Sequence, residues 1–524
     1  MPDRGEPNDP AREPETWLAG SIAVWLTQIL DRNRRCFGMK LAIDDGRQSL
    51  SWKQLHDRVE ATAGHLLGIG LRLGDRVVVI AENRVPVIGA YLALARIGAT
   101  FVPVDPELTP DEVADIVRRV SATALIGEAA RLDRLRGQQV PLLLDLDDWW
   151  SGLPVAAASG PRLAVRPDDI AAIMHTSATT GRPKGVVWDH RGLMQCSLSW
   201  LTLAEPAADM VFVNCLPLSH PGVAMCFTYM AAGAMIVLPS RLAAAEVLRA
   251  IERHRATHIW LVPGMLHELV TEAATSRYDV SGLREVIYGA AAMPGDLYRR
   301  AWGAFGCGFR QAYGMAEAGG HFAMLAPADH PQGLARQGSP DAFPVGRALP
   351  GTSVRICDEA GSDLPPGETG EVQVSSDSLM RGYWDDPRAT AQMIRDGWLR
   401  TGDLGSMDDQ GLIRLSGRLT DMIIRGGQNI YPAEIERVLR QHPGVSDAIV
   451  VGRPDPASGE VPVAYVIARA GARPVEDELR VLMRDELASY KWPVSIGFLD
   501  DHHLPLEKRR RMLRERAAQP DDLE

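Results

Sequence analysis

The residues of this chain that are best suited to chemistry lie in one short stretch, residues 175–185. Its hydroxyl, glycine and lysine members include Thr176, Ser177, Thr179, Thr180, Gly181 and Lys184. Backbone N–H groups and hydroxyls in a turn can line up toward an anion, and a lysine adds a point charge. The stretch therefore predicts a cradle for a polyphosphate. It is not of the Walker A form, because Pro183 precedes the lysine and no Ser or Thr follows it. A polar surface turn is the alternative, but such a turn does not need this density of hydroxyls.

Further segments with side chains suited to ligand binding or catalysis lie later in the chain. They are residues 311–317, which contain Tyr313, Gly314 and Glu317, residues 381–384, residues 396–404, which contain Asp403, and residues 417–421, which contain Arg418. Together with residues 175–185, these segments resemble the adenylate-forming enzymes. That family comprises acyl- and aryl-CoA ligases, the adenylation domains of peptide synthetases, and luciferases. The resemblance extends from about Trp25 to Arg514.

The resemblance implies an ATP site. Lys184 and the neighbouring hydroxyls would hold the β and γ phosphates, Tyr313 and Gly314 would meet the adenine, and Glu317 would hold Mg²⁺. A carboxylate suits Mg²⁺, which is a hard ion that also keeps water and phosphate oxygens as ligands. Asp403 would accept the ribose hydroxyls, and Arg418 would reach the ribose and a phosphate.

The resemblance also implies sites for the acid and for coenzyme A (CoA). The turn of small residues at Gly289, Ala290 and Ala291 would border the adenine and the acyl pocket. His220 would act as a gate near the acyl group, although a histidine that caps a strand end is the structural alternative. Gly426 and Gly427 would line the tunnel for the CoA thiol.

Four positions depart from the family pattern. Ala178 replaces a glycine of the phosphate stretch, and Ala316 replaces a threonine whose hydroxyl would donate to a phosphate. Thr420 occupies the hinge position, where the family mostly has Asp or Lys. The catalytic lysine position holds Arg511 when the pattern is matched without a gap, and Lys508 could substitute only if the loop shifts. Arginine keeps the charge but is a planar fork, so this exchange is not conservative. A basic face of a terminal helix is the alternative for residues 508–514.

These features leave three functions open. The first is ATP-dependent activation of a small aryl or short-to-medium acyl acid as an acyl-adenylate, with transfer to CoA. The second keeps the adenylation but transfers the acyl group to a carrier protein or an amine, or activates nitrite as ATP-dependent diazotases do. The third is a nucleotide-binding relative without catalysis. The peptide-synthetase aspartate that holds an amino group is not evident after residue 217, which weakens an amino-acid substrate.

The elements that must position these residues alternate between strand and helix. Apolar strands at residues 77–81, 101–104 and 124–126 are separated by helical patterns, which predicts parallel sheet with helices on both faces. From residue 345 onward, short strands alternate with Gly/Pro turns and predict a small antiparallel barrel. We expect a disordered lead (1–16), an N-terminal AMP-binding domain (17–417), a hinge (418–420) and a small, mobile C-terminal α+β lid domain (421–524).

Composition sets the outer limits. A chain of 524 residues is too long for one core, so two or more domains are expected. The net charge of −11 argues against nucleic acid as the main partner. The chain has no run of eighteen apolar residues, so we expect no membrane span. The first residues lack the basic segment followed by an apolar segment that is typical of a signal peptide. The six cysteines form no CxxC pair, so we expect reduced, buried thiols in a cytoplasmic protein rather than a metal site.

Overall fold

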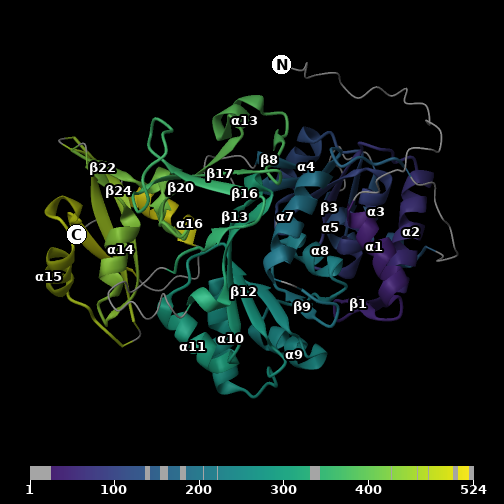
Figure 1. Ribbon diagram of the computed structural model, residues 1–524, viewed down its shortest axis with the longest axis horizontal. Helices are drawn as coiled ribbons and strands as arrows, with labels where there is room; N and C mark the ends of the chain where they lie inside the picture. Colours follow the sequence, from purple (N-terminus) through teal and green to yellow (C-terminus); the bar gives the residue numbers. More distant parts are fainter. Residues whose placement is uncertain are drawn as a thin grey trace.

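The structure is a computed structural model that describes residues 25–135, 142–153, 163–176, 184–204, 206–220, 222–330, 343–426, 428–456, 458–469, 471–499 and 506–517. Its strands form four sheets, and the N-terminal part lies at one side of the molecule and the C-terminal part at the other (Figure 1).

The first sheet has seven strands in the order β18-β8-β7-β4-β3-β5-β6. They are β3 (Arg76–Ile80), β4 (Thr100–Val104), β5 (Ala124–Gly127), β6 (Leu143–Asp145), β7 (Ile170–Thr176), β8 (Lys184–Asp189) and β18 (Gly382–Tyr383). Strands β3 to β7 pair in parallel, whereas β8 pairs antiparallel with β7 and with β18. The connecting helices are α2 (Trp52–Gly68), α3 (Val85–Ile97), α4 (Pro110–Arg119), α5 (Ala129–Arg134) and α6 (Leu146–Ser151).

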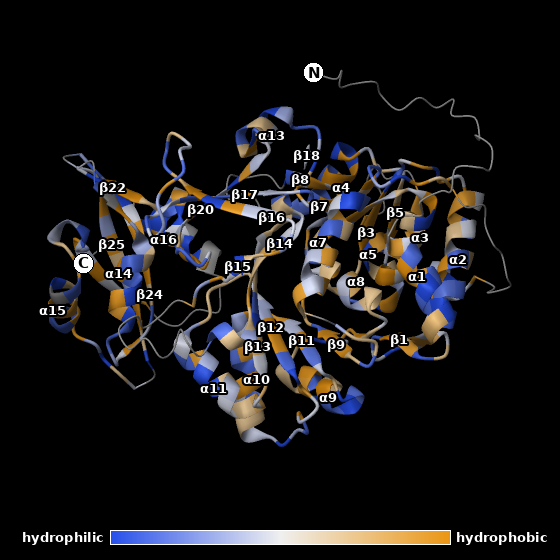
Figure 2. Cartoon of the chain, viewed as in Figure 1, coloured by the Kyte–Doolittle hydropathy of each residue, from blue (hydrophilic) through white to orange (hydrophobic). Residues whose placement is uncertain are grey.

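Alternate side chains of β3 point to opposite faces of this sheet, and helices cover both faces. Val77 and Val79 pack into the core that contains α2 and α3, while Val78 and Ile80 pack into the core that contains α4. This follows from the two-residue period of a strand. Helix α3 is buried along its whole length, as expected for a helix that is apolar on all sides. The strands β3 and β5 accordingly lie among the most hydrophobic parts of the chain (Figure 2).

The second sheet has nine strands in the order β15-β14-β13-β12-β11-β9-β10-β1-β2. They are β1 (Leu41–Asp44), β2 (Ser49–Ser51), β9 (Val211–Asn214), β10 (Met235–Val237), β11 (His258–Leu261), β12 (Glu285–Gly289), β13 (Gly308–Met315), β14 (Gly320–Leu325) and β15 (Arg347–Ala348). One face packs against α9 (Ala244–His254), α10 (Pro263–Thr275) and α11 (Gly295–Phe305). The other face shares a core with α1 (Trp25–Phe37), α3, α7 (His190–Ala204) and α8 (Val223–Ala231). That core joins the two large sheets.

The third sheet is antiparallel and has the order β16-β17-β20-β19, with β21 on the other side of β20. Its strands are β16 (Thr352–Cys357), β17 (Gly370–Ser376), β19 (Ile394–Arg395), β20 (Trp398–Met407) and β21 (Ile413–Arg418), and α13 (Pro387–Met393) precedes β19. Short helical turns complete this part of the chain: η1 (Ala316–Ala318), η2 (Pro327–Asp329) and η3 (Leu419–Asp421).

The fourth sheet belongs to the C-terminal α+β part. Its strands are β22 (Ile423–Arg425), β23 (Gln428–Ile430), β24 (Val445–Asp455), β25 (Gly459–Ala468) and β26 (Ser495–Leu499). Helices α14 (Pro432–Arg440) and α15 (Glu476–Glu486) cover one face, η4 (Ser489–Lys491) follows α15, and α16 (Leu506–Ala517) covers the other face.

The fold class expected from the sequence is confirmed: large mixed sheets with helices, a small antiparallel barrel-like sheet, and a small α+β part. One local expectation is corrected. The sequence places all of residues 175–185 in a turn, but Thr176 and Lys184 face each other in the β7–β8 ladder. No helix among the described residues has the length and apolar character needed to cross a bilayer.

Candidate active site

The site is built around Lys184, the first residue of β8. Its backbone pairs with Thr176 at the end of β7, so the two ladder residues flank the tip of the stretch. Ser177, Thr179, Thr180 and Gly181 lie outside the described residues, as does the side chain of Thr176. The Lys184 ammonium lies over the ring of Tyr383, 4.7 Å from its centroid. A cation in this position is attracted by the ring quadrupole.

Tyr383 connects the lysine to the carboxylate expected to hold Mg²⁺. Its hydroxyl donates a 2.8 Å hydrogen bond to Glu317 Oε1. Glu317 sits in η1 and is only 8% exposed. Burial, together with the Glu317 carboxylate, raises the pKa of Tyr383, so the phenol stays protonated as a donor. Strand β18 brings Tyr383 here because it pairs with β8 at Val186.

Tyr383 is the site residue that sequence reasoning missed. Residues 381–384 match the family pattern, but their sequence indicates no role for the tyrosine among them. A tyrosine two hundred residues after the lysine carries no spacing signal for a contact. The contact depends on β18 pairing with the edge of the seven-stranded sheet.

A second group joins Tyr313, Asp403 and Arg418. The Tyr313 hydroxyl donates to Asp403 Oδ2 over 2.7 Å, and Arg418 Nε lies 3.0 Å from Asp403 Oδ1. Burial and the Asp403 carboxylate raise the pKa of Tyr313 well above its ordinary value. Asp403 and Arg418 are also register partners in the β20–β21 ladder. The structure therefore brings together three residues that the sequence assigned to the adenine and ribose.

The turns around this group are tightly spaced. A Cβ at Gly314 would lie 2.1 Å from the carbonyl oxygen of Gly320, so β13 and β14 require glycine there. Ala290 follows β12 with φ of 63°, a left-handed conformation that is uncommon for a residue with a side chain. Ala290 and Ala291 are exposed to solvent.

His220 lies on the loop after β9, with its ring still exposed to solvent. Its Nδ1 is 3.2 Å from the Ser219 hydroxyl. Partial burial lowers the pKa of His220, and the Asp105 carboxylate opposes that shift. Asp105 follows β4 of the other large sheet, so His220 lies where the two sheets approach each other.

The C-terminal candidates have a different setting. Gly426 is exposed and has φ of 56°, while Gly427 lies outside the described residues. Residues 506–517 form helix α16, which agrees with the helical alternative for residues 508–514. Arg510 Nη2 lies 2.8 Å from Glu436, and Arg514 pairs with Asp421 beside the expected hinge. The side chains of Lys508 and Arg511 lie outside the described part of the chain.

One other group of possible metal ligands occurs among the described residues: Asp31, His56 and Glu60. Arg96 already pairs with both carboxylates of this group, with Nη2 2.6 Å from Asp31 and 2.5 Å from Glu60. This group is therefore a partly buried ion-pair network that links α1, α2 and α3.

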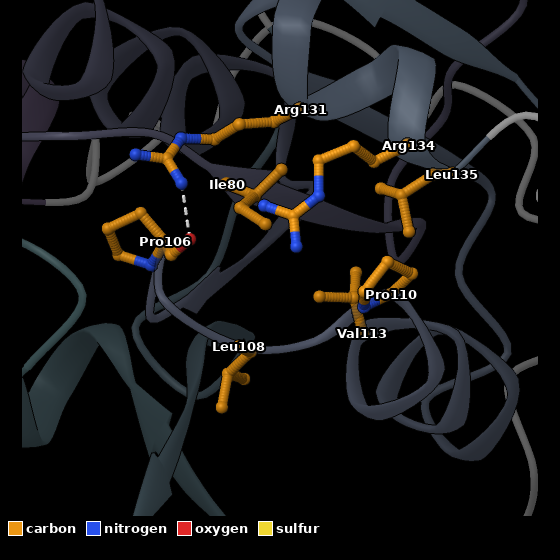
Figure 3. Close-up of a pocket in the computed structure, with 8 residues that line it drawn as sticks. All are labelled: Ile80, Pro106, Leu108, Pro110, Val113, Arg131, Arg134 and Leu135. Atoms are coloured by element: carbon orange, nitrogen blue, oxygen red, sulfur yellow. Dashed lines mark hydrogen bonds between the residues drawn. The ribbon is translucent and has the colours of Figure 1, made fainter.

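A small pocket lies at the carboxyl ends of the strands of the seven-stranded sheet (Figure 3). It is lined by Ile80, Pro106, Leu108, Pro110, Val113, Arg131, Arg134 and Leu135. Its volume of about 10 Å³ corresponds to roughly one water molecule, so it does not accommodate a nucleotide. In Figure 3 the Arg131 side chain reaches the carbonyl of Pro106, which closes one side of the pocket.

Comparisons with known proteins agree with this arrangement. The family model described as AMP-binding enzyme matches residues 30–384, and the model described as AMP-binding enzyme C-terminal domain matches residues 434–510. A feruloyl-CoA synthase from Amycolatopsis sp is 34% identical, with 88% of this chain and 92% of that protein covered. An indoleacetate–CoA ligase from Aromatoleum aromaticum is 33% identical, with 91% and 94% covered. The solved structure of the amide bond synthetase McbA from Marinactinospora thermotolerans is 33% identical, with a TM-score of 0.83 and 93% and 99% covered.

Proposed function

The chain belongs to the AMP-binding enzymes of the AMP-forming acid–CoA ligase type, and from that premise we propose that it converts a small aryl or acyl acid to its CoA thioester. In the first step a carboxylate oxygen attacks the α-phosphorus of ATP and pyrophosphate leaves. In the second step the CoA thiol attacks the acyl carbonyl, the carbon–sulfur bond forms, and AMP leaves.

The observation that carries this proposal is the connection Lys184–Tyr383–Glu317. It places a cation over the ring face and a buried carboxylate at the hydroxyl of one tyrosine side chain. Phosphoryl-transfer sites act mainly by positioning and by neutralising charge. Lys184 would bind the outer phosphates together with Thr176, Ser177, Thr179, Thr180 and Gly181, and this supports release of pyrophosphate from the α-phosphorus.

Glu317 suits Mg²⁺, because carboxylate oxygen is the donor this ion prefers and a hydroxyl already orients the group. When bound, Mg²⁺ supplies positive charge to the phosphates. Tyr383 would hold the Glu317 carboxylate in place while Lys184 stays over the face of its ring.

The remaining residues have supporting roles in the proposal. Tyr313 and Gly314 would bind the adenine, with Gly289, Ala290 and Ala291 along its edge, and Asp403 and Arg418 would bind the ribose. His220 would face the acyl group. Gly426 and Gly427 would contact the thiol when residues 421–524 rotate about the hinge 418–420, and Arg511 or Lys508 would bridge the acid and the α-phosphate.

Exchange of labelled pyrophosphate into ATP, measured across a panel of acids, tests the first step, and thioester formation tests the second. We expect acid-dependent exchange that Lys184→Ala abolishes, and thioester formation when CoA is added. Lys53→Ala is the matched control, because Lys53 lies on α2 and pairs with Asp57. Exchange with nitrite alone, or nucleotide binding without any exchange, would contradict the proposal.

A second candidate acceptor is an amine or a carrier protein. The similarity to an amide bond synthetase and the arginine at position 511 favour keeping this option. The same adenylate can be offered CoA, a panel of amines, or a carrier protein. Amide or carrier-bound product without thioester would assign the second step to this alternative.

A further inference from the structure

The short turn η1 carries Glu317, and three donors from distant parts of the chain bind its three backbone carbonyl groups. The Trp188 indole donates from Nε1 to the first carbonyl oxygen of η1 over 2.8 Å. The backbone N–H of Met380 donates to the second over 2.9 Å. The Ser378 hydroxyl donates to the third, also over 2.9 Å. We call these three donors the η1 clamp.

The turn depends on partners from outside because it is so short. A helix that stops after one turn leaves its last carbonyl groups without partners further along its own backbone. One internal bond forms in η1, from the N–H of Gly319 to the first carbonyl oxygen. Trp188 and Ser378 are 2% and 3% exposed. Removing either side-chain donor therefore takes a hydrogen bond from a buried carbonyl, which is unfavourable.

The end of η1 also packs tightly against residue 378. Gly319 follows η1 in a left-handed conformation, with φ of 77°. A Cβ at Gly319 would lie 1.9 Å from the Ser378 carbonyl oxygen, so glycine is needed for this close approach. The hydrogen bond and the packing act between the same two segments. The turn therefore has little freedom to move relative to residue 378.

The donors belong to elements that carry other residues of the proposed ATP site. Trp188 and Lys184 lie on the same face of β8, because side chains alternate along a strand. Residues 378 and 380 lie in the short segment that leads into β18 and Tyr383. The η1 clamp thus connects Glu317 to the two elements that carry Lys184 and Tyr383.

We propose that Trp188 and Ser378 are positioning residues of the magnesium site. They bind the backbone of η1 on either side of Glu317, and by holding it they set the direction of the Glu317 carboxylate. The inference rests on the proposed function, because Glu317 must be the residue that binds the ion.

The chemistry of Mg²⁺ explains why this turn has to be held. The ion demands near-ideal octahedral geometry, so a ligand whose backbone can shift binds it poorly. The Tyr383 hydroxyl restrains the end of the Glu317 side chain. The η1 clamp restrains the backbone from which that side chain starts. Both restraints are needed to fix the position of the carboxylate oxygens.

Two variants, Trp188→Phe and Ser378→Ala, remove one donor each and leave the carboxylate itself unchanged. We expect the Kd of ATP in EDTA, measured by calorimetry, to stay as in the wild type. The factor by which Mg²⁺ tightens ATP binding should fall by about tenfold, the lower end of the effect of partners that orient a metal ligand. A purely structural role would not alter this factor.

Hydrogen exchange in the metal-free protein tests the η1 clamp without any ligand. The Gly319 amide is protected by its bond to the first carbonyl of η1. In peptides that cover η1, exchange followed by mass spectrometry should be faster in both variants, because local opening is opposed by one donor fewer. Peptides from β25 should exchange as in the wild type.

Two matched controls remove donors to backbone carbonyls elsewhere. Ser199→Ala loses a 2.6 Å bond to the Pro350 carbonyl oxygen, and Ser199 is 4% exposed. Trp492→Phe loses a 2.9 Å bond to the Leu487 carbonyl oxygen in the C-terminal part. Both controls should keep the wild-type dependence of ATP binding on Mg²⁺ and the wild-type exchange in η1.

The outcomes separate the two proposals. If neither variant changes the effect of Mg²⁺ on ATP binding, or if exchange in η1 is unaltered, the positioning role is wrong while adenylation stands. The same conclusion follows if both variants weaken ATP binding equally with and without Mg²⁺. If no acid supports pyrophosphate exchange by the wild type, adenylation fails and this inference fails with it.

Discussion

At the scale of single residues, Tyr383 shows how one side chain can organise two charged groups. The ring face attracts the Lys184 ammonium, and the hydroxyl donates to Glu317. The two contacts use different parts of the side chain, the ring face and the hydroxyl. The sequence proposes Lys184 and Glu317 for these roles, because their residue types suit phosphate and magnesium. It does not propose the tyrosine that contacts both, because the contribution of that side chain is geometric.

Tyr383→Phe separates the two contacts. The phenyl ring keeps the surface under Lys184, while the hydrogen bond to Glu317 is lost. Partners that orient a metal ligand typically affect metal affinity or activity by 10- to 100-fold. We expect the apparent Mg²⁺ requirement for pyrophosphate exchange to rise by about tenfold, with a small change in the KM for ATP.

Tyr278→Phe is the matched control for this prediction. Tyr278 also donates a 2.8 Å hydrogen bond to a glutamate, Glu272, but it does so at the end of α10, away from Lys184. Its loss should leave the magnesium requirement unchanged. An equal response from both variants would show that Tyr383 does not act through Glu317.

At the scale of elements, the sequence predicts the helices and strands whose buried apolar residues recur with a regular period. It does not predict the strand ends that form only because a neighbouring strand pairs with them. Strands such as β3 and β11 are short apolar runs bounded by turns, and they were found. Thr176 and Lys184 were placed in a turn because their side chains are polar. They extend the β7–β8 ladder because each backbone finds its partner across the hairpin.

The close approach of β13 and β14 gives an element-scale prediction. Gly314→Ala would place a methyl group 2.1 Å from the Gly320 carbonyl oxygen, so one strand must shift. Overpacking of this kind costs about 1–3 kcal/mol. Thermal unfolding should show a lower Tm, and activity should fall because Tyr313 is the preceding residue.

Gly303→Ala is the corresponding control. Gly303 lies in helix α11, and a Cβ there would meet nothing within 4 Å. Alanine favours helix by about 1 kcal/mol over glycine, so this variant should be neutral or more stable. A Tm that falls equally in both variants would argue against the steric account of Gly314.

The attachment of α16 gives a second element-scale prediction. Asp421 of η3 pairs with Arg514, and their side chains are 16% and 36% exposed. A double-mutant cycle with Asp421→Ala and Arg514→Ala should give a coupling of about 1 kcal/mol in thermal unfolding. The exposed pair Glu246 and Arg249 should give roughly half of that or less. No coupling between Asp421 and Arg514 would mean that this ion pair does not help to hold α16 in place.

At the scale of the whole molecule, buried histidines make stability depend on pH. Burial lowers the pKa of His190, His258, His321 and His330 to about 4 each. The unfolded chain therefore binds more protons than the folded chain between pH 4 and 6.5. Their contribution to stability is present above pH 6.5 and is lost as the pH falls toward 4.

Calorimetry should show this loss as a falling Tm from pH 6.5 to 5, a range above the titration of most carboxylates. His190→Leu should make the fall shallower, since both ring nitrogens of His190 lack partners and no bond is broken. A Tm that is constant across this range would contradict the assignment of neutral, buried imidazoles.

The general arrangement of the molecule was predictable, whereas the acid was not. The residue types of the hydroxyl-rich and glycine-rich segments predict nucleotide binding, and these segments follow one another along the chain. Contacts between the two large sheets come from distant parts of the chain, as where Trp200 of α7 and Trp260 of β11 meet His321 of β14. The directions of these side chains depend on how the two sheets pack, and the spacing of the residues along the sequence does not predict those directions.

The last described helix has a practical consequence for handling the protein. Leu513 and Ala517 of α16 cover the face of the sheet formed by Ile449, Val451, Val463 and Tyr465. A protease cut or a shortened chain ending before Leu506 would uncover these four side chains at once. Such a fragment should adhere to itself and precipitate, so reporter fusions are better attached beyond Ala517 than in place of the helix.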